Sequence, residues 1–85
     1  MASYGQISQF DSSVESWTLY TERLGQFFLA NGIEDPDRQR AIFLTVVGPA
    51  TYALLSNLIS PEAPTNKTLR EIVAVLSSHS SQHLQ

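Results

Sequence analysis

The chain has 85 residues, a formal net charge of −3 and no cysteine. This length supports one domain. The lack of cysteine excludes disulfides, zinc knuckles and thiol catalysis within it. Its five basic residues form no run, so we expect no direct binding of nucleic acid by this segment. Charged residues make up 15% of the chain against a typical value of about 25%, which leaves room for an apolar patch that meets a partner.

The N-terminal part predicts a short lead-in and one long amphipathic helix. Residues 1–9 are small and polar, which is typical of an extended or disordered lead-in. Ser12 and Glu15 match a capping box, and Asn31-Gly32 suits a helix C-terminus, so we expect a helix over about residues 13–31. Its candidate core or groove residues recur at spacings of three and four, which places them on one face: Trp17, Tyr20, Leu24, Phe27 and Phe28.

Gly25 lies in the middle of this expected helix, where glycine costs about 1 kcal/mol relative to alanine. Two interpretations are open. A neighbouring helix packs closely against the missing side chain, or the glycine forms a notch in which a ligand binds.

The central part predicts two helices joined by a sharp corner. Asp35-Pro36 is a helix-start signal, because aspartate caps the end and proline is favoured at the first helical position. Gly48-Pro49 then interrupts a strongly apolar stretch and is the candidate structural corner. We therefore expect helices over about residues 36–47 and 49–58. The second half of the first one is apolar on all sides, which predicts that neighbouring helices enclose it.

A loop with two prolines follows, and then a fourth helix. Thr68 and Glu71 form a second capping-box pattern. An apolar stripe begins at Leu69 and continues to Leu76, so the helix is expected over about residues 68–79. The pattern is lost after that, and residues 80–85 are expected to be a frayed tail. The sequence thus predicts an all-α fold, a small bundle of four helices that occupies residues 10–79.

No residue pattern indicates catalysis, a metal or a cofactor. His79 and His83 have the spacing of two metal ligands on one helical face, but no third ligand is evident. The sequence has no nucleophile elbow or phosphate-binding loop, and its clustered carboxylates at residues 34–37 are explained by capping of a helix. We expect no enzyme activity. No apolar run reaches the ~18–20 residues of a membrane span, and no signal-peptide pattern is present, so a cytoplasmic or nuclear location without membrane contact is expected.

An ordered series of residues across the helices resembles a known family, the N-terminal lobe of the capsid region in Gag polyproteins of Ty3/Gypsy-type long-terminal-repeat retrotransposons. The series covers about residues 10–79 and consists of Phe10-Asp11, Trp17-x-x-Tyr20-x-x-Arg23-Leu24-x-x-Phe27-Phe28-x-Ala30-Asn31-Gly32-Ile33, Arg40-Ala41-x-Phe43-Leu44-x-x-Val47-Gly48-x-x-x-Tyr52-x-Leu54-Leu55 and Pro64-Thr65…Leu69-x-Glu71-Ile72-Val73-x-x-Leu76…His79.

The resemblance implies an all-helical capsid lobe whose copies pack into a shell, or a host protein that reuses this lobe. The chain departs from the family pattern at two places. Ser80-Ser81-Gln82 follow His79 where a Phe and a Pro are common, and Gly25 replaces a more usual charged residue. The second helical lobe and zinc knuckle of such Gag proteins lie outside these 85 residues, so dimerisation through that lobe and RNA packaging are not carried over.

Three functions are therefore open. The first is a non-enzymatic, capsid-like module that contacts copies of itself or other Gag proteins and assembles into particles. The second is a domesticated adaptor that binds short host peptides in a hydrophobic groove. The third is a truncated capsid lobe that interferes with assembly of intact Gag.

Overall fold

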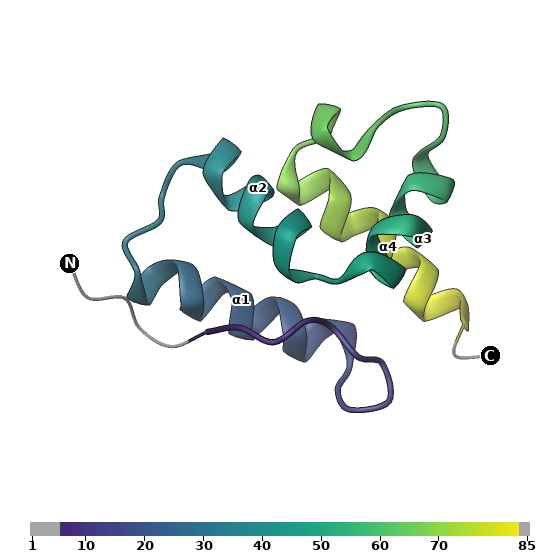
Figure 1. Ribbon diagram of the computed structural model, residues 1–85. Helices are drawn as coiled ribbons and strands as arrows, with labels where there is room; N and C mark the ends of the chain where they lie inside the picture. The colour runs from purple at the N-terminus through teal and green to yellow at the C-terminus, as the bar shows by residue number, and fades with distance from the viewer. Residues whose placement is uncertain (1–5, 84–85) are drawn as a thin grey trace.

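The computed structural model describes residues 6–83, and all regular structure in this range is helical (Figure 1). The all-α prediction is therefore confirmed. Four α-helices and one short 3₁₀ helix follow each other along the chain: α1 (Trp17–Ala30), α2 (Pro36–Val46), α3 (Pro49–Ile59), η1 (Pro64–Asn66) and α4 (Leu69–His83).

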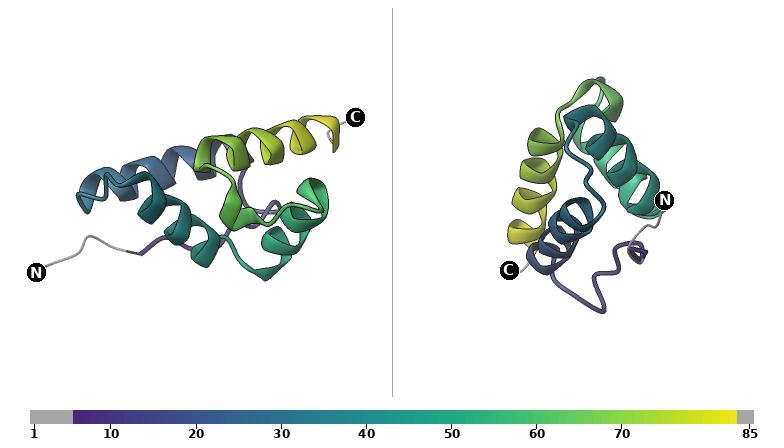
Figure 2. Two further views of the ribbon diagram at one scale, coloured as in Figure 1. Left: turned by 90° about the horizontal axis from the view of Figure 1, so that it is seen from above. Right: turned by 90° about the vertical axis from the view of Figure 1, so that its left-hand side faces the viewer.

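The last helix holds the others together. α4 contacts each of α1, α2 and α3, while η1 contacts α2 and α3. Two further views show α2 and α3 on one side of the molecule and α4 on the other (Figure 2). The core between them is built from the apolar stripes of all four helices and two connecting residues, Ile33 and Val47: Trp17, Tyr20, Leu24, Phe28, Ile33, Phe43, Val47, Leu55, Ile59, Ile72 and Leu76.

The start of α1 lies four residues later than the sequence predicted, and the first capping-box interpretation is wrong. Ser16 is the N-cap, and its Oγ accepts a hydrogen bond from the Leu19 N–H at 3.2 Å. The preceding residues form a turn, because the Asp11 carboxylate accepts from both the N–H and the Oγ–H of Ser13, at 2.9 and 2.6 Å. Aspartate competes for local backbone donors in this way, which favours a turn over a helix.

The end of α1 and the starts of α2 and α4 agree with the sequence. The Asp35 carboxylate accepts from the Arg38 N–H at 2.9 Å and caps α2. Thr68 and Glu71 form the expected reciprocal box before α4, with distances of 2.9 and 3.1 Å. Gly32, with φ of 64°, ends α1. These contacts satisfy backbone groups that a helix end leaves without partners.

The Gly48-Pro49 corner is present as predicted, and the axes of α2 and α3 differ by 118° there. Gly48 has φ of 96° and ψ of 156°, a conformation that is essentially restricted to glycine. No single helix in the described part of the chain is long and apolar enough to cross a membrane; α2 and α3 meet that criterion only when they are taken together across this bend.

α4 continues to His83, beyond the expected helix end near residue 79. The expected tail over residues 80–85 is therefore helical as far as residue 83, and residues 84–85 lie outside the described part. Serine and histidine continue a helix at modest cost, so the loss of an apolar pattern did not mark its end.

Candidate functional site

The aromatic face of α1 is mainly core. Trp17, Tyr20 and Phe28 are buried, as is Leu24, while Phe27 is half-buried and packs at the edge of the core. The Trp17 ring meets the Phe43 ring edge-on, with 5.8 Å between the ring centroids. Of the two roles that the sequence left open for these five residues, packing accounts for this face.

An extended segment, residues 6–10, lies along the same face of α1, and we refer to it as the strap (Figure 1). Its Phe10 ring meets the rings of Trp17 and Tyr20 edge-on, with centroid distances of 5.0 and 5.4 Å. The Tyr20 hydroxyl donates a hydrogen bond of 2.9 Å to the Ser8 carbonyl oxygen. Burial raises the pKa of Tyr20. The sequence analysis missed this docking, although the apolar Ile7 and Phe10 within a polar segment were a signal for it.

Arg23 joins the strap, the turn and α1. Its guanidinium donates to both carboxylate oxygens of Glu15, at 2.6 and 3.1 Å, and to Ser8 Oγ at 3.3 Å. The same group lies 5.4 Å from the centroid of the Tyr20 ring. The hydrogen bond from Arg23 lowers the pKa of the Glu15 carboxyl. The Arg23 side chain is 45% exposed, so water screens this ion pair, and we assign the pair a positioning role and only a small share of the stability.

Gly25 opens into a groove. A Cβ built on it would meet no atom within 4 Å, so the interpretation that a neighbouring helix packs against this glycine is wrong. The groove beside it has a volume of about 550 Å³ and lies between α1, the start of α2 and the start of α4. Its walls are largely apolar and include Leu24, Phe28, Leu29, Leu69 and Val73.

The expected enclosure of the second half of α2 is only partial. Its Phe43 is buried and its other large apolar side chains pack against the core, whereas Ala41 and Thr45 are exposed. Between Arg40 and Glu62 the chain carries no charged residue, yet only Phe43, Val47, Leu55 and Ile59 of this stretch are buried. Leu58 of α3 is 41% exposed. We call the exposed apolar side chains of this stretch the α2–α3 surface: Ala41, Pro49, Ala50, Tyr52, Ala53 and Leu58.

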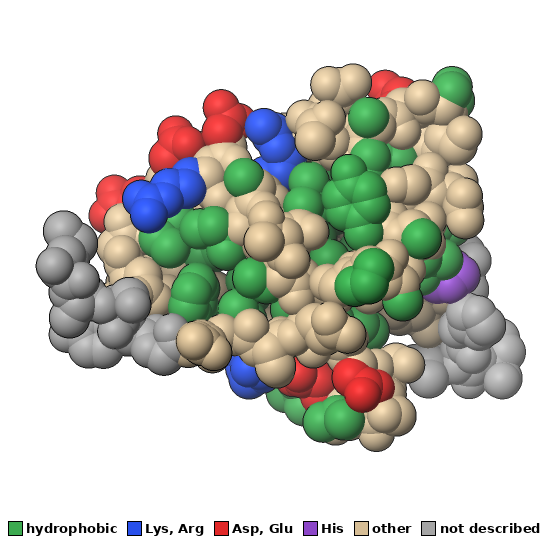
Figure 3. All heavy atoms as spheres, in the orientation of Figure 1, with side chains coloured by type: hydrophobic (Ala, Val, Ile, Leu, Met, Phe, Trp, Pro, Cys, Tyr) green, Lys and Arg blue, Asp and Glu red, His purple; other side chains and the backbone are tan. Residues whose placement is uncertain are grey.

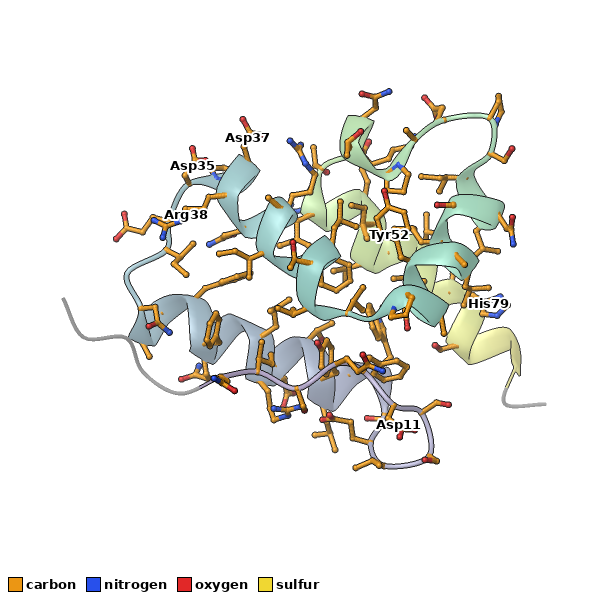
Figure 4. All side chains as sticks on the ribbon, in the orientation of Figure 1. Asp11, Asp35, Asp37, Arg38, Tyr52 and His79 are labelled. Atoms are coloured by element: carbon orange, nitrogen blue, oxygen red, sulfur yellow. The ribbon has the colours of Figure 1, made fainter. Side chains whose placement is uncertain are left out.

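Figure 3 shows hydrophobic side chains gathered over α3 and the adjoining end of α2, with the charged groups toward the edges of this face. Tyr52 lies on this side of the molecule (Figure 4). Two faces with different surroundings thus explain why apolar residues occur on all sides of a helix here. One face is buried in the core, and the other is available to a partner.

Polar groups do not converge on a reaction centre within residues 6–83. This range contains no group of three His, Cys, Asp or Glu residues that could hold a metal ion. Two of the carboxylates that cluster at the start of α2 have local partners, since Asp35 caps the helix and Asp37 lies 3.4 Å from the Arg40 guanidinium. The side chain of His83 lies outside the described part. The Nε1–H of Trp17 is a buried donor for which the described residues provide no acceptor.

Comparison with known proteins gives no match, whether the chain is compared with family models, with curated proteins or with solved structures.

Proposed function

We propose that this chain is a non-enzymatic, capsid-like module of Gag-derived type whose α2–α3 surface makes protein–protein contacts by self-association. The observation that carries the proposal is the uncharged stretch between Arg40 and Glu62, one face of which is exposed on the surface of the molecule. Burial of apolar surface contributes about 25 cal/mol per Å². An interface without charged groups adds no cost for desolvating them.

The assignment to a capsid-like module rests on the order of the elements together with the residue series described above. The described helices follow each other with the Gly48-Pro49 corner between the second and the third, as in the family that the sequence resembles. A shell is built from modest contacts that symmetry repeats. An uncharged surface of small and large apolar residues on one side of a monomer supports contacts of this kind.

Glutamate at Ala53 or Leu58 is expected to abolish self-association. Both side chains are exposed and helical, so Ala53→Glu and Leu58→Glu should leave the fold intact while placing a charge in an apolar contact. Sedimentation equilibrium from micromolar to millimolar concentration measures the effect. The matched control is Leu19→Glu, an equally simple change at a 52% exposed leucine of α1. A wild-type chain that stays monomeric over this range, or glutamate variants that associate as the wild type does, would contradict the proposal.

A second candidate function is supported by the groove at Gly25. An adaptor that binds a short apolar peptide needs a preformed hollow with apolar walls, and a helix position without a side chain provides one. In this case the peptide lies across α1 and the start of α4, on a surface separate from the α2–α3 surface.

Gly25→Leu tests this second candidate, because it fills the groove from an exposed position and leaves the core unchanged. A panel of ten-residue peptides with leucine or phenylalanine anchors is titrated while backbone amide shifts are followed. The adaptor predicts saturable shifts confined to the groove residues in the wild type, and a loss of at least about tenfold in affinity for Gly25→Leu. Ala53→Glu is the control and should bind normally. Shifts that are absent, or that are the same in both chains, would reject the adaptor.

A further inference from the structure

The face of α1 that carries Trp17 and Tyr20 must be covered by a strap for the core to be complete. Tyr20 is fully buried, and its hydroxyl has the Ser8 carbonyl as its acceptor. A buried hydroxyl that loses its acceptor costs about 1–3 kcal/mol. Phe10 adds edge-on contacts with Trp17 and Tyr20, and such aromatic pairs contribute about 0.5–1.5 kcal/mol each beyond their burial. The contacts join one segment to one helix face, and none of them depends on which copy of the chain supplies the segment.

The link between the strap and α1 is a turn with local hydrogen bonds. The Asp11 carbonyl oxygen accepts from the N–H groups of Val14 and Glu15, at 3.0 and 3.2 Å, and the Asp11 carboxylate accepts from Ser13. Residues 11–14 are exposed, so water can replace these bonds when the turn opens. Opening the turn therefore breaks only local hydrogen bonds and no contact within the helical core.

The turn also stands away from the other helices. A hollow of about 1060 Å³ lies between the strap and turn on one side and α3 and α4 on the other, with Leu54 and His79 in its wall. Val14, at the middle of the turn, is 76% exposed. A large apolar side chain at the tip of the link is free to contact another protein when the link is extended.

We propose that copies of this chain exchange straps. Residues 6–10 of one copy bind the Trp17–Tyr20 face of α1 in a second copy, and the strap of the second copy binds either the first copy or a third. The six residues 11–16 span up to about 20 Å when extended, enough to carry the strap to a neighbour. Exchange of an identical element needs no new binding surface and is a low-cost route to assembly. This inference rests on the proposed self-association and names the segment that each partner contributes.

Engineered cysteines test the exchange, because the natural chain has none and every disulfide must then join chosen positions. Ile7 of the strap and Phe27 of α1 line one hollow, so Ile7→Cys and Phe27→Cys mark the two sides of the contact. The two single variants are mixed, unfolded in urea, refolded together at millimolar concentration and oxidised. Ser13→Cys mixed with Phe27→Cys is the control for random collision. Strap exchange predicts a covalent heterodimer at a yield about tenfold or more above the control.

A second measurement does not depend on sulfur geometry. Isotope-labelled and unlabelled wild-type chains are refolded together, and isotope-filtered NOEs are recorded between the Phe10 ring of one copy and the Trp17 ring of another. Intermolecular NOEs support the exchange. Their absence, together with a heterodimer yield equal to the control, overturns it.

The same samples separate this inference from the proposed function. Association that Leu58→Glu abolishes, without NOEs between Phe10 and Trp17 of different copies, overturns strap exchange and leaves the α2–α3 surface as the interface. NOEs that persist in Leu58→Glu support the exchange and reject the role of the α2–α3 surface. A chain that remains monomeric after refolding overturns both.

Discussion

Replacing Phe43 by alanine is expected to remove about 3–5 kcal/mol of stability, the usual cost of this truncation in a core. Phe43 is fully buried and its ring meets Trp17, so it connects α2 to α1. A domain of this size has a free energy of unfolding of only about 4–13 kcal/mol. The loss is therefore a large part of the total stability, and the urea midpoint should fall markedly. Urea denaturation followed by circular dichroism measures the loss.

Phe27→Ala is the matched control for this prediction, because it removes the same side chain from a half-buried position at the core edge. We expect a cost of less than half that of Phe43→Ala, since the loss scales with the apolar area that is removed from contact. Equal costs for the two variants would contradict the assignment of Phe43 to the centre of the core.

Alanine at Gly48 is expected to destabilise the fold by about 1–3 kcal/mol, because a residue with a side chain is strained in this conformation. The φ of 96° and ψ of 156° cannot change without altering the bend between α2 and α3. The new methyl group would also meet the Gln9 side chain at 3.0 Å. That contact can be relieved by movement of the Gln9 amide, so the backbone accounts for most of the cost. Thermal unfolding measures it.

Alanine at Gly25 is expected to stabilise the fold, whereas alanine at Gly48 destabilises it. Gly25→Ala lies inside α1, and its methyl group meets no atom within 4 Å. Alanine is favoured over glycine in a helix by up to about 1 kcal/mol, so the melting temperature should rise. A fall at Gly25, or no change at Gly48, would show that the two glycines do not have the backbone roles assigned to them.

Local signals predicted most helix ends correctly. The Asp35-Pro36 start, the Thr68–Glu71 box and the Gly48-Pro49 corner each depend on atoms within a few residues, and the structure confirms them. The start of α1 was wrong because two local patterns competed there. Ser12 and Glu15 had the spacing of a capping box. However, Asp11 forms a turn with Ser13, and Glu15 forms an ion pair with Arg23 of α1.

The candidate sites needed information that periodicity does not contain. An apolar pattern states that side chains avoid water, but it does not state whether a neighbouring helix or a separate molecule covers them. The second half of α2 was therefore predicted to be enclosed by neighbouring helices, while the structure leaves Ala41 and Thr45 on the surface. Gly25 had two interpretations in the sequence, and only the distances around it separated a packed contact from an open groove.

The sequence by itself determined that this protein is helical, where most of its helices begin and end, and which residues of α1 face the core. These features depend on hydrogen bonds and side-chain spacing within a few residues of each other. Only the tertiary structure decided that the strap completes the core and that Gly25 opens into a groove. It also decided that one face of the uncharged stretch between Arg40 and Glu62 is exposed to solvent. Those features arise from the way in which segments distant in the sequence pack against each other, and the sequence pattern of one segment does not contain this information.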